Sequence, residues 1–191
     1  MPLKDKWDKT FSQSENKNTV ANEVLQQNAH LLPAFGAALD LACGLGGNAL
    51  LLAQAGLETH AWDISGVALA KLQASAQGAG LKILTQTRDV EINPPAPDCF
   101  DVIVVGHFLY RPGFDALLAA LKMNGLLFYQ TFTREKVSQS GPSNPDYLLG
   151  KNELLDLCRD MKILVYREEN KQGDISRGWR DRAMLVAQKS L

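Results

Sequence analysis

Cysteine is scarce in this chain of 191 residues, which has only Cys43, Cys99 and Cys158. They are too few and too scattered for a disulfide framework, and no Cys-x-x-Cys pair or cysteine–histidine cluster indicates a metal site. Long apolar runs are also missing, because no segment approaches the roughly 18 apolar residues that a membrane-spanning helix needs. The first residues lack the apolar stretch of a secretory signal peptide. We therefore expect a cytoplasmic protein with no membrane partner and no metal.

The chain has no excess of charge of one sign. It has 20 Lys and Arg against 21 Asp and Glu, a formal net charge of -1. A nucleic-acid coat or a polybasic membrane binder would be more basic, so we do not expect nucleic acid as a partner. Hydrophobic residues make up 46% of the chain, an ordinary globular value that excludes global disorder. The composition does not indicate an oligomeric state.

Strand and helix patterns alternate from residue 37 onward. Helix-spaced apolar residues predict helices at 48–56, 65–78, 114–121 and 154–161. Short apolar runs predict buried strands at 37–42, 59–63, 83–89, 100–106, 126–132, 163–168 and 183–188. The last two strands have no helix between them, so the final strand is expected to be antiparallel. The pattern predicts an α/β fold: a doubly wound, mostly parallel, seven-stranded Rossmann-like sheet with helices on both faces.

We expect a single domain, 1–191, with two unusual segments. Residues 1–35 are polar apart from a few apolar points such as Trp7 and Phe11. We interpret them as an N-terminal helical lid. Residues 133–149 form a loop longer than most connections in compact domains, which favours a functional loop on the substrate side.

The loop after the first predicted strand is rich in glycine. Gly44, Gly46 and Gly47 let the backbone turn sharply and approach a ligand closely. Asn48 opens the next helix, whose N-terminal amides can receive an anionic group. Asp63 ends the second strand, 19 residues after Gly44, where its carboxylate can accept hydrogen bonds from both hydroxyls of a ribose. This order of elements predicts a ligand that contains a nucleoside.

Residues 44–49 also fit the Gly-x-Gly-x-x-Ala fingerprint of dinucleotide-binding folds, so an NAD-dependent oxidoreductase is one alternative. Two further acids argue against it. Asp40 lies inside the first strand, where its carboxylate could reach a cationic amino group, directly or through water. Asp89 ends the third strand, where it could accept from an adenine amino group. With Asp63 they suit a ligand carrying ammonium, ribose diol and adenine amine, and suit a pyrophosphate poorly because like charges repel.

These residues resemble a known superfamily. Segment 39–48, Leu-Asp-Leu-Ala-Cys-Gly-Leu-Gly-Gly-Asn, resembles motif I of class I S-adenosylmethionine-dependent methyltransferases, acid-x-Gly-x-Gly-x-Gly. Ala42 replaces the first glycine, a change that we expect to restrict the backbone only mildly. Segment 61–65 resembles the ribose-binding acid, 88–90 the adenine site and 100–104 the fourth strand of that superfamily. The specific resemblance covers roughly residues 35–135.

Within the superfamily the chain is most similar to small bacterial methyltransferases of the tellurite-resistance type. That similarity rests on the Trp7-Asp8 start, on segment 48–50 and on the helix start at 152–154. The resemblance implies S-adenosyl-L-methionine as the cofactor. The residues that it implies for cofactor binding are Trp7, Asp40, Ala42, Cys43, Gly44, Gly46, Asn48, Asp63, Ile64, Asp89, Val90, Gly106 and His107.

The segment after the fourth strand, 106–112, lines both the methionine moiety and the substrate in this superfamily. His107 is a candidate general base, since its unperturbed pKa lies near 6.5. It could instead pack on the cofactor and contribute backbone contacts. Tyr110 and Arg111 are candidates for orienting an anionic acceptor, or they form a surface pair.

The resemblance and the three acids together predict a methyltransferase that uses S-adenosyl-L-methionine. We expect it to transfer the methyl group to a small-molecule acceptor by in-line displacement. Two alternatives stay open at this point. One is a regulatory protein that binds S-adenosylmethionine without turnover, and the other is the NAD-dependent oxidoreductase.

Overall fold

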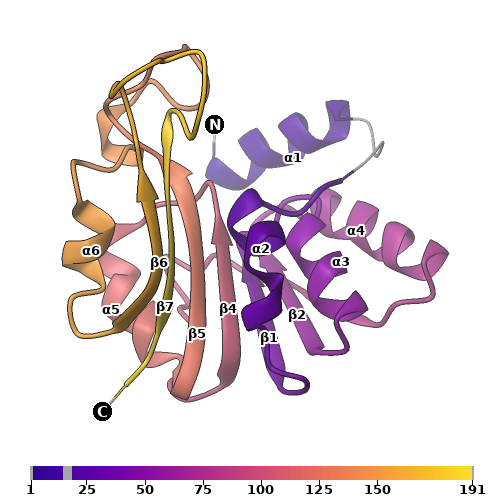
Figure 1. The fold of residues 1–191 in the computed structure, drawn as a ribbon. Helices are drawn as coiled ribbons and strands as arrows, with labels where there is room; N and C mark the ends of the chain where they lie inside the picture. Colours follow the sequence, from indigo (N-terminus) through magenta and orange to yellow (C-terminus); the bar gives the residue numbers. More distant parts are fainter. Residues whose placement is uncertain (1, 15–18, 191) are drawn as a thin grey trace.

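The computed structural model describes residues 2–14 and 19–190, which fold around one sheet (Figure 1). Its strands are β1 (Ala37–Leu41), β2 (Glu58–Asp63), β3 (Ile83–Thr87), β4 (Phe100–Gly106), β5 (Leu121–Phe132), β6 (Lys162–Glu168) and β7 (Arg182–Gln188). The sheet order is β3-β2-β1-β4-β5-β7-β6, and β7 runs antiparallel to both of its neighbours. The doubly wound α/β fold with an antiparallel last strand is therefore confirmed.

The α-helices cover both faces of this sheet. They are α1 (Leu3–Gln13), α2 (Glu23–Gln27), α3 (Gly47–Gln54), α4 (Gly66–Gly78), α5 (Phe114–Ala119) and α6 (Glu153–Leu157). Short 3-10 helices lie at Ala29–Leu31, Arg111–Gly113 and Pro145–Tyr147. Figure 1 shows α2, α3 and α4 on one face of the sheet and α5 and α6 on the other. No helix among the described residues is long and apolar enough to cross a membrane.

Alternate residues of the central strands supply the two sides of the core. In β4, Val102 and Val104 pack in the cluster that contains residues of α2 and α3, whereas Ile103 and Val105 pack in the cluster that contains residues of α5 and α6. All four side chains are fully buried. Because successive side chains of a strand point to opposite faces, an apolar strand with no polar alternation must be covered on both sides.

Two strand boundaries differ from those predicted. The third strand ends at Thr87 rather than Asp89, because Asp89 accepts backbone hydrogen bonds from Glu91 and Asn93 in a turn. The fifth strand starts at Leu121 rather than residue 126. Its register with β4 shifts there, because Phe100 pairs with Leu121 and Val102 pairs with Leu126. Residues 122–125 are therefore unpaired with β4 although the strand continues.

The predicted lid, residues 1–35, contains two differently packed helices. In α2, Val24 and Leu25 are fully buried in the core cluster that includes residues of β5 and β7. By contrast, α1 has no buried residue and packs on α4. Figure 1 places α1 beyond the ends of the central strands. Only α1 therefore has the position of a cover, whereas α2 is part of the core.

We expect the Leu25→Ala variant to lower the free energy of unfolding by about 2–5 kcal/mol, because it removes a fully buried side chain and leaves a cavity. Urea unfolding measures this loss. Gln27→Ala, on the exposed side of the same helix, is the matched control and should change stability little. Equal small effects in both variants would show that α2 is not part of the core.

Candidate functional site

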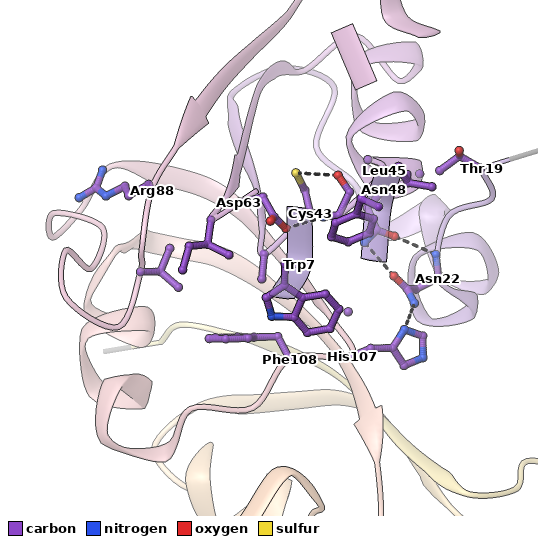
Figure 2. Close-up of a pocket in the computed structure, with 18 of the residues that line it drawn as sticks. Trp7, Thr19, Asn22, Cys43, Leu45, Asn48, Asp63, Arg88, His107 and Phe108 are labelled. Carbon is purple, nitrogen blue, oxygen red and sulfur yellow. Dashed lines mark hydrogen bonds between the residues drawn. The ribbon is translucent and has the colours of Figure 1, made fainter. Parts of the chain in front are cut away.

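A cavity of about 450 Å³ lies where β1, β2 and β4 end. Its volume is in the range of roughly 300–1,000 Å³ that is typical of small-molecule sites. It is lined from one side by residues 42–48, 63–64, 88–91 and 106–108, and from the N-terminal region by Leu3, Trp7, Phe11, Thr19, Val20 and Asn22. Figure 2 shows these side chains converging from segments that are far apart in the sequence.

The glycine-rich loop has the left-handed backbone that its composition suggests. Gly44 and Gly46 have φ angles of 54° and 77°, where glycine carries no penalty. A side chain at Gly46 would also overlap Leu72 of α4. Ala42 has a φ angle of 54°. Its Cβ makes this conformation cost roughly 1–2 kcal/mol, so the replacement of glycine here is less mild than expected.

Asp63 connects the end of β2 to the glycine-rich loop. Its Oδ2 accepts a hydrogen bond from the Gly44 amide at 2.8 Å, and its Oδ1 accepts one from the Ser65 amide at 2.8 Å. Burial raises the pKa of this carboxyl. Each oxygen has a second lone pair, and Asp63 and the adjacent Ile64 both line the cavity. The carboxylate therefore organises the loop and has acceptor capacity left for a ligand hydroxyl.

Asp40, which we expected to reach a ligand amino group directly or through water, is not among the residues that line the cavity. Its side chain is fully buried beneath the start of α3. There, Oδ1 accepts a hydrogen bond from the Asn48 side-chain amide at 3.2 Å and Oδ2 accepts one from the Ala49 backbone amide at 3.0 Å. Burial raises the pKa of Asp40 to about 7. Asp40 therefore positions Asn48, and Asn48 lines the cavity.

The proposed adenine side of the cavity is formed by the turn after β3. Asp89 and Val90 both line the cavity. The neighbouring Arg88 holds this turn in place, because its guanidinium donates hydrogen bonds of 2.7 and 2.6 Å to two backbone carbonyls of loop 93–97. The same guanidinium lies 4.1 Å from the ring centroid of Trp62. Two of its donors are therefore engaged by the protein.

Two aromatic side chains of α1 cover the glycine-rich loop. The Trp7 and Phe11 rings stack with centroids 5.7 Å apart, and both line the cavity. The helix is tied to α4 at its middle and at its C-terminal end: Asp8 accepts a 2.6 Å hydrogen bond from the Ser65 hydroxyl, which caps α4, and Lys71 donates to the carbonyls of Phe11 and Ser14. Figure 2 shows the Trp7 indole in the middle of the cavity lining, next to Phe108.

The turn after β4 brings His107 to the cavity beside Asn22. His107 has a φ angle of 58°, its amide donates to the Gln130 carbonyl at 2.8 Å, and its ring packs against Phe132 with centroids 5.0 Å apart. The ring Nδ1 lies 3.1 Å from the Asn22 side-chain nitrogen. Gly106 is required here because a side chain at this position would overlap the Asn22 amide.

Tyr110 and Arg111, which we expected to orient an acceptor or to form a surface pair, are not among the residues that line the cavity. Tyr110 lines a separate small apolar cavity. The Arg111 guanidinium contacts both carboxylate oxygens of Glu153, at 2.5 and 2.9 Å. It also donates to the backbone carbonyls of Asp146 and Leu148. Because Asp146 and Leu148 lie in loop 133–149, Arg111 fixes the end of that loop.

The other residues that we predicted for cofactor binding all lie around the cavity. Those lining the cavity are Trp7, Ala42, Cys43, Gly44, Gly46, Asn48, Asp63, Ile64, Asp89, Val90, Gly106 and His107. Their contact with a ligand stays a prediction. Sequence reasoning missed Asn22, because it stands in a polar segment without a motif and acquires its partners only in the folded chain. Within residues 2–14 and 19–190, no group of three or more His, Cys, Asp or Glu side chains is arranged to hold a metal ion.

The raised pKa of Asp40 makes stability depend on pH. The folded chain binds the Asp40 proton more tightly than the unfolded chain does. This contribution to the free energy of unfolding is full below about pH 4 and is lost as the pH rises toward 7. The Asp40→Asn variant should not show this loss. Its free energy of unfolding should therefore change less between pH 4 and pH 7 than that of the wild type, by a few kcal/mol at roughly 1.4 kcal/mol per pKa unit. Urea unfolding across this pH interval measures it, and Asp5→Asn, an exposed site, is the control. Parallel curves for wild type and Asp40→Asn would contradict the assignment.

We expect Arg111→Lys to loosen residues 144–150 without weakening cofactor binding, because lysine cannot contact both Glu153 oxygens and two carbonyls at once. Amide hydrogen exchange reports on the loop, and calorimetric titration with S-adenosylhomocysteine reports on the cavity. Arg159→Lys, at an exposed site, serves as the control. Weaker binding with unchanged loop exchange would instead place Arg111 at the ligand.

Comparison with known proteins shows what this chain resembles. Residues 38–125 match the family model described as a methyltransferase domain. Among solved structures, TehB from Haemophilus influenzae is 22% identical with a TM-score of 0.71, and the match covers 96% of this chain and 67% of that one. A protein described for the conversion of a disulfide bond into a thioacetal group during echinomycin biosynthesis is 17% identical, with a TM-score of 0.73 and coverage of 99% and 93%.

A SAM-dependent methyltransferase from Methanosarcina mazei is 18% identical, with a TM-score of 0.66 and coverage of 90% and 99%. A search of curated proteins gives no match. At these identities the solved structures show the fold alone, and the family model adds a resemblance to methyltransferase domains over residues 38–125. The predicted resemblance, including that to the tellurite-resistance type through TehB, is confirmed. Residues 38–125 thus resemble a methyltransferase domain, and the fold is shared with S-adenosylmethionine-dependent methyltransferases among the solved structures.

Proposed function

We propose that this protein transfers the methyl group of S-adenosyl-L-methionine to a small-molecule acceptor. The observation that carries the proposal is the covered cavity. One cavity of about 450 Å³ brings the glycine-rich loop, Asp63 and the turn after β4 together beneath the aromatic side chains of α1.

The cavity has a polar group for each part of the cofactor. Asp63 has lone pairs free for the ribose hydroxyls, and Asp89 lies where the adenine amine is expected. Asn48 and the glycine-rich loop border the region expected for the methionine moiety. The residues present therefore fit the cofactor, with Asp40 acting through Asn48 rather than by direct contact.

The start of α3 argues against the NAD-dependent alternative. A dinucleotide places its pyrophosphate against the N-terminal amides of this helix. Here the Ala49 amide is already bonded to the Asp40 carboxylate, and a side chain at Gly47 would overlap the backbone carbonyl of Val20. The helix end is therefore both occupied by a carboxylate and covered by the N-terminal segment.

The charges that line the cavity argue against a nucleic-acid acceptor. Asp63, Asp89 and Glu91 line it, and Arg88 is the one arginine or lysine among the described lining residues. Arg88 donates two hydrogen bonds to loop 93–97 and its guanidinium stacks on Trp62. A phosphate backbone needs several unengaged cations, which this lining does not offer.

When bound, the cofactor supplies an electrophilic methyl group on a sulfonium, which an acceptor lone pair takes in line as S-adenosylhomocysteine leaves. The task of the protein is then to align the acceptor with that methyl group. Alignment of this kind can supply about 7–11 kcal/mol. Trp7 and Phe11 would also exclude water from the reacting atoms.

A second candidate function is cofactor binding without turnover, and one observation favours it. Both ring nitrogens of His107 face side-chain amides, so the candidate general base is engaged by the protein. An acceptor that is already a good nucleophile needs no base, so this observation does not exclude transfer. Turnover must therefore be measured separately from binding.

Thermal unfolding with S-adenosylhomocysteine, and separately with NADH, tests the ligand. At about 100 times its dissociation constant a ligand adds about 2.7 kcal/mol, which should raise the midpoint by roughly 5–10 °C. We expect the shift with S-adenosylhomocysteine alone. The Asp63→Ala variant, which removes the expected ribose contact, should lose it. A shift with NADH alone would overturn the assignment.

Production of S-adenosylhomocysteine in the presence of small thiols, amines and hydroxyl compounds then tests transfer. We expect one acceptor class to raise this production above the rate without acceptor. Binding without stimulation by any of these acceptors would favour the regulatory alternative. Stimulation by RNA or DNA instead, lost at high salt, would overturn the small-molecule assignment.

A further inference from the structure

The His107 ring lies between two primary amides, a contact that the proposed reaction does not use. Its Nδ1 is 3.1 Å from Nδ2 of Asn22, and its Nε2 is 3.5 Å from Nε2 of Gln130. Figure 2 shows Asn22 between Asn48 and His107, with hydrogen bonds to both. Which amide atom faces the ring decides what protonation state the ring can adopt, so the orientation of each amide matters.

The orientation of Asn22 follows from a backbone amide that can only donate. The Asn22 N–H points at an amide atom of Asn48 at 2.8 Å, so that atom must be the oxygen. The other Asn48 atom is then the NH2 group, which donates to Asp40 and, at 2.8 Å, to the Asn22 side chain. The Asn22 atom that accepts this bond must be its oxygen. Its NH2 group therefore faces His107 Nδ1.

The same reasoning fixes Gln130. The backbone N–H of Val24 points at Gln130 Oε1 at 2.9 Å, which identifies that atom as the oxygen. Its NH2 group donates to Glu23 at 2.8 Å and faces His107 Nε2. Two N–H donors therefore face the two ring nitrogens. A doubly protonated ring would oppose a donor with a donor on both sides. A neutral ring can accept from Asn22 at Nδ1, the shorter contact at 3.1 Å, and its Nε2 hydrogen then opposes only the Gln130 amide, at the longer distance of 3.5 Å.

We propose that Asn22 is a positioning residue that holds His107 as an uncharged ring with its hydrogen on Nε2. His107 then shapes the transfer site without exchanging a proton with the acceptor. The second statement rests on the proposed function, whereas the first concerns the folded chain alone. If the Asn22 amide rotated to accept from a protonated ring, it would lose its hydrogen bond from Asn48. Asn48 is itself held by Asp40, so these hydrogen bonds oppose the rotation.

The charges around the ring act in the same direction. Although His107 is exposed to the cavity, the surrounding protein atoms disfavour its charged form, and this desolvation lowers its pKa. Arg182 of β7 lowers the pKa further, and Glu23 of α2 opposes it. Glu23 is itself paired with Arg182 at 3.0 Å. A neutral ring also suits the cofactor, because a cationic ring lining the cavity would repel the sulfonium and the ammonium.

NMR titration of the wild-type chain with isotope-labelled histidine tests the proposal directly. The His107 signals are assigned by their loss in His107→Gln. We expect Nδ1 to be the unprotonated nitrogen at neutral pH and the titration midpoint to lie below the ordinary value near 6.5. A hydrogen on Nδ1, or a midpoint at or above that value, would overturn the proposal. This measurement needs neither a cofactor nor an Asn22 variant.

Asn22→Asp replaces the donor with an acceptor of the same shape. A carboxylate oxygen at Nδ1 should stabilise the charged ring and raise the His107 midpoint by about 1–3 units. Gln27→Glu is the matched control, since it adds the same charge at an exposed site of the adjacent helix α2. An equal shift in both variants would contradict a specific role for Asn22. If Asn22→Asp does not fold, the wild-type titration still decides the question.

Titration in the presence of S-adenosylmethionine and of S-adenosylhomocysteine separates this proposal from the proposed function. The sulfonium should lower the His107 midpoint further than the uncharged thioether does, because like charges repel. An unchanged midpoint with both ligands, together with no thermal shift, would refute cofactor binding and leave the state of the ring established. An equal midpoint with both bound ligands would refute the role of the neutral ring at the transfer site.

Discussion

The site depends on one buried carboxylate at the start of α3. Asp40 is fully buried, and its two oxygens are satisfied by the Asn48 side chain and the Ala49 backbone amide. Burial disfavours its charged form and raises its pKa to about 7, and the two hydrogen bonds at the helix N-terminus partly offset that cost. From there the hydrogen bonds continue through Asn48 and Asn22 to His107. The end of β1 is thereby joined to the end of β4 across the cavity floor.

The two helices of the N-terminal segment have different positions at the cavity. The buried α2 is part of the core and delivers Asn22 to the inside of the cavity. The outer helix α1 covers the same cavity with Trp7 and Phe11 but buries no residue of its own. Its attachment through Asp8 and Lys71 is polar. A cover held by a few polar contacts can open at low cost, whereas α2 cannot leave without exposing apolar core.

Charged side chains near the cavity are mostly engaged by the protein rather than offered to a ligand. Arg88 holds the turn after β3, Arg111 holds the end of loop 133–149, and Arg182 is paired with Glu23. The lining carboxylates differ: Asp63, for example, has acceptor capacity left after it has organised the glycine-rich loop. The cavity is therefore suited to a cationic, hydroxyl-rich ligand more than to a phosphate.

The order of strands, the glycine-rich loop and the acid at the end of β2 were readable from the sequence, because each depends on local pattern and spacing. The roles of Asp40, Arg111 and Asn22 were not. A residue type shows what a side chain can bond, but the partner is decided by which distant segment the fold brings within about 3 Å. Asp40 is hydrogen-bonded to amides of α3, Arg111 to Glu153, and Asn22 to Asn48 and His107. The sequence by itself determined the sheet and its cofactor loop, whereas only the tertiary structure decided which polar groups remain free to act, because those groups are satisfied by partners distant in the chain.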